Sequence, residues 1–145
     1  MPDETHYRKL ENMYLAAPCN VYYAPHITIG AGTAEIVIPV SEKLFHAAGA
    51  VHGATYFKVL DDAAFFAANS LVTDVFVLTA NFNLYLLRPA SSGEIRAVGK
   101  VVSQSRSQLI AEAVAYDSRE REIARGSGTF VKSQSPLTPE IGYKL

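Results

Sequence analysis

The spacing of apolar and polar residues changes several times along the chain, and each spacing predicts a different element. Near the N-terminus, apolar side chains recur every three or four residues, at Tyr7, Leu10, Met13 and Tyr14. This is the period of an amphipathic helix, which we expect over about residues 5–17. Pro18 has no backbone N–H to donate within a helix, so we expect the helix to end there.

A second, longer helix is predicted in the middle of the chain. Residues 52–72 are rich in alanine and phenylalanine, contain no proline, and contain no glycine after Gly53. Apolar residues fall on nearly every face, which predicts a helix enclosed by protein on most sides. Its only charged residues are Lys58, Asp61 and Asp62.

Six further segments are rich in β-branched and aromatic residues and are separated by turn-forming residues, which predicts strands. They cover Val21–Ile29, Thr33–Val40, Val75–Leu87, Ile95–Ser103, Gln108–Tyr116 and Glu122–Val131. Strict alternation along the third of these strands would place Thr79, with Asn81 and Asn83, on the face away from the central helix. Residues 133–145, which include two prolines, are expected to form an irregular tail.

This order of elements predicts an α+β fold in which an antiparallel sheet wraps around one long central helix. The length of 145 residues suits a single domain over residues 1–145. Hydrophobic residues make up 49% of the chain and charged residues 19%, which excludes a disordered protein. Thirteen basic and 14 acidic residues give a net charge of −1, which argues against nucleic acid as the main partner.

Composition also narrows the chemistry and the expected location. Cys19 is the only cysteine and the four histidines are scattered, so we expect neither a disulfide nor a metal site. The N-terminus does not have the basic and then apolar pattern of a signal peptide. Uncharged apolar runs fall short of the ~18 residues that a membrane span needs. We therefore expect a soluble, cytoplasmic protein with no membrane partner.

The central segment carries the candidate chemistry. Gly53 at the start of the helix would let a substrate approach free backbone N–H groups at the positive end of the helix dipole, an arrangement that suits a developing oxyanion. Asp61 shares an apolar stripe with Phe57 and Phe65, so its carboxylate would be desolvated, as a general base or nucleophile requires. The alternatives are that Gly53 only marks a turn and that Asp61 is a solvated surface residue. We expect Asp62 to pair with Lys58 at i,i+4.

Helix geometry separates the two candidate groups. Gly53 and Asp61 are eight positions apart, which is about 12 Å along a helix axis. One reacting carbonyl cannot contact both groups of the same helix. If both act on one substrate, they must come from two chains, which predicts a symmetric homodimer with two composite sites.

Three motifs carry a resemblance to a known family. Gly49-x-x-His52-Gly53 precedes the central helix, Leu60-Asp61-x-Ala63 lies within it, and Leu87-Arg88-Pro89-Ala90 ends the next strand. With weaker matches in the later strands, the region from about His46 to Val131 resembles the hotdog-fold acyl-CoA thioesterases of the PaaI-like group.

The resemblance implies a hotdog fold and hydrolysis of an acyl-CoA thioester to a free acid and coenzyme A. By this resemblance, Asp61 would activate water or attack the thioester carbonyl. The Gly53 backbone N–H would hold the carbonyl oxygen, and His52 would shape the turn. Thr79 stands where the family often has a hydroxyl residue that helps to place the water, and Arg106 where a basic residue often meets the coenzyme A tail. No cofactor is implied, since coenzyme A enters only as part of the substrate, and the protein is expected to be a homodimer or a dimer of dimers.

The chain departs from the family pattern at three positions. His46 stands where the family commonly has an asparagine that orients substrate or water. Ala54 replaces the second glycine of the usual His-Gly-Gly, and its methyl group narrows the approach to the helix start. Ser105 precedes Arg106 where glycine is frequent. His46 and Ala54 are therefore expected to lie at the substrate, with a role that differs from the family pattern.

Two other functions remain open at this stage. A hotdog hydratase or dehydratase would pair a histidine before the helix with a helix carboxylate, as His46 and Asp61 do here, although that carboxylate is usually glutamate. A non-catalytic acyl-CoA-binding domain would have lost activity through the changes at His46 and Ala54. Four aromatic residues also have two interpretations, as plain core or as the lining of an aromatic-acyl or medium-chain pocket: Tyr56, Phe57, Phe65 and Phe66.

Overall fold

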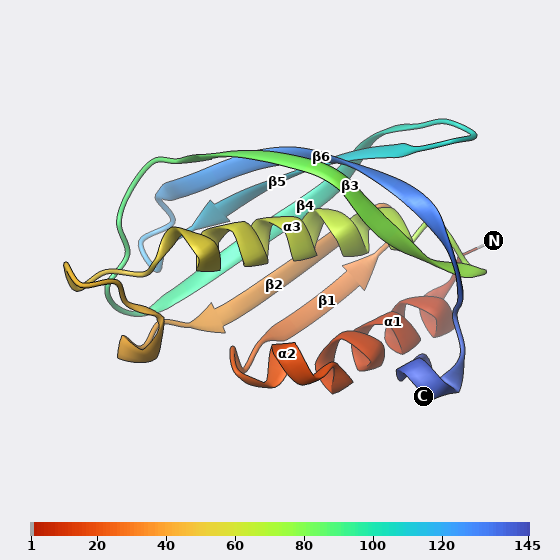
Figure 1. The fold of residues 1–145 in the computed structure, drawn as a ribbon, viewed down its shortest axis with the longest axis horizontal. Helices are drawn as coiled ribbons and strands as arrows, with labels where there is room; N and C mark the ends of the chain where they lie inside the picture. Colours follow the sequence, from red (N-terminus) through yellow and green to blue (C-terminus); the bar gives the residue numbers. More distant parts are fainter. Residues whose placement is uncertain (1) are drawn as a thin grey trace.

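The computed structural model describes residues 2–145 and shows a curved sheet that wraps around one long helix (Figure 1). The helices are α1 (Glu4–Ala16), α2 (Pro18–Val21) and α3 (Gly53–Asn69). The strands are β1 (His26–Gly30), β2 (Thr33–Pro39), β3 (Val75–Leu86), β4 (Glu94–Gln104), β5 (Leu109–Tyr116) and β6 (Glu122–Pro136). Short 3₁₀ turns occur at Glu42–Leu44 and Pro139–Ile141.

The six strands form one antiparallel sheet in the order β1-β2-β4-β5-β6-β3. Strands β1 and β3 are therefore its two edges. The sheet curls so that its concave face holds α3, and α1 lies outside α3, next to β1 (Figure 1). This is the α+β arrangement that the order of elements predicts.

The close seating of α3 on the sheet explains why the helix is so rich in alanine. Val59, Leu60, Ala63 and Ala67 have no solvent-accessible surface, and small side chains let the helix backbone approach the strands. The approach is closest at Gly99 of β4, where an added Cβ would lie 2.3 Å from the Ala63 carbonyl oxygen. The glycine is required here by space, because no larger residue fits between helix and strand.

A bulge in β3 overturns the expected alternation along that strand. Thr79 pairs with Phe130 of β6 but Asn81 pairs with Thr129, so Ala80 is an extra residue without a partner. Because one inserted residue exchanges the two faces of a strand, Thr79 faces the central helix before the bulge and Phe82 faces it afterwards. The prediction that Thr79 and Asn81 share one outward face is therefore wrong.

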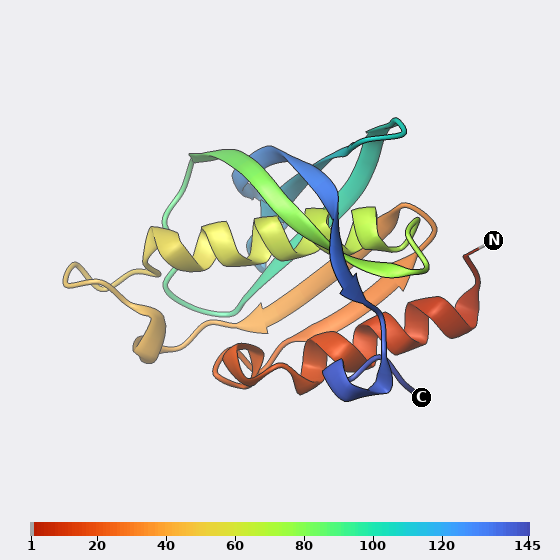
Figure 2. The same cartoon turned by 45° about the vertical axis from the view of Figure 1, so that its right-hand side comes forward.

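The ends of the predicted elements also need correction. Residues 21–25 are not strand, because Pro18 starts the short helix α2 and β1 begins only at His26. Strand β6 continues to Pro136 alongside β3, so residues 133–136 are ordered strand, where the sequence predicts an irregular tail. The chain then turns back to α1 (Figure 2). Across residues 2–145, no helix has the length and apolar character needed to cross a membrane.

Substituting Gly99→Ala should destabilise the fold, because the new methyl group would force α3 away from β4. We expect a loss of about 1–3 kcal/mol in the free energy of unfolding, as for other overpacked cores, measured by urea denaturation. Gly30→Ala is the matched control, since its Cβ would meet only the flexible Thr33 side chain at 3.1 Å. Equal effects of the two substitutions would contradict the close seating of α3.

Candidate active site

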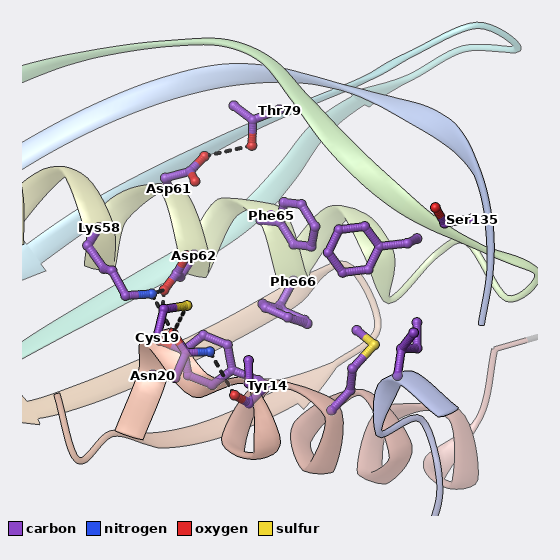
Figure 3. A pocket seen from close by; sticks show the side chains of 14 residues that line it. Tyr14, Cys19, Asn20, Lys58, Asp61, Asp62, Phe65, Phe66, Thr79 and Ser135 are labelled. Atoms are coloured by element: carbon purple, nitrogen blue, oxygen red, sulfur yellow. Dashed lines mark hydrogen bonds and ion pairs between the residues drawn. The ribbon is translucent and has the colours of Figure 1, made fainter. Parts of the chain in front are cut away.

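A cleft of about 450 Å³ lies along α3, between that helix and the N-terminal segment (Figure 3). Its wall is mostly apolar, and aromatic rings from three elements contribute to it: Tyr14, Phe65, Phe66 and Phe76. Most of the polar groups gather at one end of the cleft, where Asp61, Lys58 and Thr79 lie, whereas Ser135 lies toward the other end (Figure 3). An apolar cleft with a few convergent polar groups is the usual form of a small-molecule site.

Asp61 and Thr79 are in direct contact at the polar end of this cleft (Figure 3). Asp61 comes from the middle of α3, and Thr79 is turned toward it by the bulge in β3. The Thr79 hydroxyl donates to Asp61 Oδ1 at 2.9 Å, and this is the one hydrogen bond of the Asp61 carboxylate within residues 2–145. Its other oxygen, Oδ2, is free to bind a water molecule or a substrate.

Burial makes the Asp61 carboxylate a stronger base than an ordinary aspartate. The pKa of Asp61 is raised above 3.8, chiefly because the half-buried carboxylate has lost hydration. The Thr79 hydrogen bond lowers this pKa, the neighbouring Asp62 charge raises it, and Lys58 lowers it by a smaller amount. Desolvation is the largest of these effects, as it is for catalytic carboxylates in apolar pockets.

A second polar cluster lies next to Asp61 and joins α3 to the N-terminal segment. The Lys58 ammonium donates to Asp62 Oδ2 at 2.5 Å and to Asn20 Oδ1 at 2.6 Å. The Tyr14 hydroxyl donates to the same Asp62 oxygen at 2.8 Å. Desolvation nevertheless raises the pKa of Asp62, and the charge and hydrogen bond of Lys58 lower it. The predicted i,i+4 pair of Lys58 and Asp62 is confirmed.

The start of α3 provides a free backbone donor. His52 is the N-cap, and its Nδ1 accepts from the Ala54 N–H at 2.9 Å. The Gly53 N–H, at the first helical position, has no acceptor within the described chain. A Cβ at Gly53 would lie 2.9 Å from Leu86 Cδ1, so the glycine keeps the helix start open next to β3. The geometry is that of an anion-binding helix N-terminus.

Gly53 lines a different cavity from Asp61. This second cavity, of about 330 Å³, is also lined by His46, Tyr56 and Leu86. The predicted site residues thus fall into two groups within one protomer, with His46 near Gly53 and Thr79 beside Asp61. The eight-residue separation along α3, about 12 Å, keeps the two groups apart.

The remaining predicted site residues, Ala54 and Arg106, line neither the cleft at Asp61 nor the cavity at Gly53. Ala54 is exposed at the start of α3, beside Gly53. Arg106 lies in the exposed turn between β4 and β5, in a cavity with Leu71 and Lys132 at the far end of α3. The structure brings Arg106 close to neither Gly53 nor Asp61 of the same chain.

Sequence reasoning missed the contribution of the N-terminal segment. The sequence pattern predicts Tyr14 only as part of the apolar face of a helix, and nothing in the local sequence marks Asn20 as buried. The nearest signal is that Lys58 and Asp62 are charged residues in an otherwise apolar helix, which requires polar partners from elsewhere. Among the described residues, no group of three or more His, Cys, Asp or Glu side chains is placed to hold a metal ion.

Comparisons with known proteins agree on family and fold. The sequence model of the thioesterase superfamily matches residues 48–124. A Saccharolobus solfataricus protein named "Putative esterase SSO1253" is 26% identical over 100 residues, covering 69% of this chain and 67% of that protein. A thioesterase family protein from Silicibacter pomeroyi is 28% identical in sequence, with a TM-score of 0.81 over 87% of this chain and 96% of its own.

The E. coli PaaI protein from the phenylacetic acid degradation operon has a TM-score of 0.86 at 17% identity. That match covers 95% of this chain and all of the PaaI chain. The similarity extends over both the sheet and the central helix, so the predicted hotdog fold is confirmed.

Replacing Asp61 with asparagine should stabilise the protein at neutral pH. Since the pKa of Asp61 is raised by folding, ionising this group favours the unfolded chain. The stability gained by Asp61→Asn should be absent below the ordinary pKa of 3.8, grow as the pH rises through the folded pKa, and then stay constant. Urea unfolding of both proteins from pH 3 to pH 8 measures this difference, and a variant less stable than wild type at pH 7 would contradict it.

Proposed function

The chain belongs to the thioesterase superfamily and is a thioester hydrolase, and we propose that it cleaves acyl-CoA thioesters to a free acid and coenzyme A. The observation that carries the proposal is the Asp61 carboxylate, held by Thr79 at the polar end of an apolar cleft. An apolar cleft suits an acyl chain, and a desolvated carboxylate suits attack on a carbonyl.

In the proposed reaction, Asp61 acts on the thioester carbonyl in one of two ways. It removes a proton from a water molecule that then adds to the carbonyl carbon, or it adds to that carbon itself through Oδ2. Thr79 holds Oδ1 and so fixes the direction of Oδ2. In either route the tetrahedral adduct collapses and the C–S bond breaks. The coenzyme A thiolate takes up a proton, from protonated Asp61 in the first route and from solvent in the second. In the second route, water then hydrolyses the acyl–Asp61 anhydride, which releases the acid and restores the carboxylate. Thiolate is a good leaving group, so these steps need no metal ion.

We assign the stabilisation of the carbonyl oxygen to Gly53 of a second chain. Within one protomer, Gly53 and Asp61 line different cavities. The unpaired outer edge of β3 offers a surface for pairing, since Leu78, Tyr85 and Leu86 are apolar and 49%, 71% and 54% exposed. Joining two β3 edges about a twofold axis would cover these side chains and let the two α3 helices run past each other. A homodimer of this form has two composite sites.

Asp61→Asn should reduce the release of free thiol from acyl-CoA by about 10²–10⁴-fold, the usual contribution of a general base. The amide keeps the size of the side chain and still accepts from Thr79, so acyl-CoA binding should persist. Asp74→Asn, in the exposed turn before β3, is the control for loss of a carboxylate and should retain activity. Thiol release by Asp61→Asn at the wild-type rate would remove Asp61 from the mechanism. Enoyl-CoA hydration, measured in parallel, is expected to be absent, and hydration without thiol release would favour the hydratase alternative.

Gly53→Pro tests the backbone donor directly. Proline is favoured at the first position of a helix, and His52 already has the extended backbone, with φ −63° and ψ 143°, that a following proline requires. The substitution therefore removes the N–H without breaking α3. Gly53→Ala introduces the same contact with Leu86 and keeps the N–H. We expect kcat to fall about 10²-fold or more in Gly53→Pro relative to Gly53→Ala, as for loss of an oxyanion donor, and equal activities would contradict the assignment.

The same variants test whether the site is shared between chains. Mixing and reassociating inactive Asp61→Asn and Gly53→Pro subunits should produce mixed dimers in which one of the two sites has both native groups. With random mixing, about a quarter of all sites would be native, so about a quarter of wild-type activity should return. No recovery in mixtures shown to contain mixed dimers would place both groups of each site in one chain.

A further inference from the structure

The apolar part of the cleft ends at a wall built by the two ends of the chain. Met13 of α1 and Ile141 of the C-terminal 3₁₀ turn line the cleft together with Phe66 and Phe76. Phe66 lies beyond Asp61 in the direction of the C-terminal end of α3 (Figure 3), and its ring packs against that of Tyr14, the residue that follows Met13 in α1. From Asp61 to Phe66 is five residues, or about 7.5 Å along the helix axis. The whole cleft has a volume of about 450 Å³, which sets an upper limit on the acyl group that it can enclose.

We propose that Met13 and Ile141 form the end wall of the acyl pocket and restrict the enzyme to compact apolar acyl groups, excluding long fatty acyl chains. This inference rests on the proposed function, because it assigns the cleft beside Asp61 to the acyl part of the substrate. It adds two specificity-determining residues that lie outside the catalytic groups.

Specific contacts fix the α1 side of the wall to the central helix. Tyr14 donates to Asp62, and Asn20 accepts from Lys58, so the N-terminal segment is anchored to α3 by buried polar groups. Farther along, His6 is buried and its Nε2 donates to the Asn69 carbonyl oxygen at 3.0 Å, at the end of α3. Leaving any of these buried polar groups unpaired would be costly, so the helix has a defined position over the cleft.

The C-terminal side of the wall is attached to α1 in turn. The Tyr143 hydroxyl donates to His6 Nδ1 at 2.7 Å, and Asn12 Nδ2 donates to the Lys144 carbonyl oxygen at 2.8 Å. The Lys9 ammonium lies 5.3 Å from the centre of the Tyr143 ring. These contacts hold the turn that carries Ile141 against α1 and so give this side of the wall a defined position.

Both wall residues, Met13 and Ile141, lie outside the region that matches the superfamily. The superfamily match covers residues 48–124, which include Asp61 and Thr79 but neither Met13 nor Ile141. The catalytic end of the cleft thus comes from the matched region, and the closed end comes from segments on either side of it. This division suits a pocket in which the reaction is common to the superfamily and the flanking segments select the acyl group.

The test measures kcat/KM for alkanoyl-CoA substrates from hexanoyl to hexadecanoyl. Wild type should hydrolyse the short members and lose activity as the chain lengthens. Ile141→Ala and Met13→Ala should each raise the ratio of kcat/KM for dodecanoyl-CoA to that for hexanoyl-CoA by about tenfold, in line with the value of lost methylene contacts in a pocket. Leu15→Ala is the matched control, since Leu15 is also on α1 but is 45% exposed and does not line the cleft.

Using both Ile141→Ala and Met13→Ala guards against a result that reflects unfolding of one variant. Ile141 is 43% exposed, so its substitution should fold normally even if removal of the buried Met13 side chain destabilises the protein. A chain-length profile that is unchanged in folded Ile141→Ala and Met13→Ala proteins, or a wild type that prefers hexadecanoyl-CoA, would overturn the inference.

A binding measurement separates this inference from the proposed function. Calorimetric titration of the Asp61→Asn protein with the same acyl-CoA series reports acyl selection without turnover. If wild type releases no thiol from any acyl-CoA but Ile141→Ala binds dodecanoyl-CoA about tenfold more tightly than its parent, the hydrolase proposal fails and the end wall stands. If thiol is released but neither variant changes the preference in turnover or binding, the end wall fails and the hydrolase proposal stands.

Discussion

The burial of α3 in the concave face of the sheet is the constraint on which the other features depend. The backbone of α3 touches β4 at Gly99, so only side chains on the flanks of the helix have room for polar groups. Asp61 and Asp62 lie on two such flanks, one toward β3 and one toward the N-terminal segment. The two adjacent carboxylates, Asp61 and Asp62, therefore have different hydrogen-bond partners. Asp62 is neutralised by Lys58 and holds the N-terminal segment in place, while Asp61 keeps one oxygen free in the cleft.

The fold could be predicted from the sequence largely because local signals and the overall architecture agree. The three- and four-residue period around Leu10 and Met13 predicts α1, and the alanine-rich run predicts a helix enclosed by protein. The remaining segments have the pattern of strands, and an antiparallel sheet packed against that helix is the simplest α+β arrangement for them. The ends of the helices and strands were less predictable. Pro18 ends one helix and begins another, and β6 continues through residues 133–136 because β3 lies alongside to pair with it.

The site was predictable only where its residues are close in sequence. Gly53, His52 and Asp61 lie within one turn-and-helix motif, so their arrangement follows from helix geometry. The position of Thr79 depends on a single unpaired residue, Ala80, and a bulge leaves no mark in an alternating sequence. The contacts of Tyr14 and Asn20 depend on where the N-terminal segment packs, which local propensity does not determine.

The bulge in β3 has a consequence beyond the direction of Thr79. A long, exposed edge strand with apolar residues invites the open-ended addition of further strands that leads to fibrils. The extra residue at Ala80 interrupts the ladder on that strand and increases its local twist. A regular incoming strand cannot follow this edge continuously. The feature that turns a hydroxyl group toward the carboxylate therefore also makes this edge a poorer template for added strands.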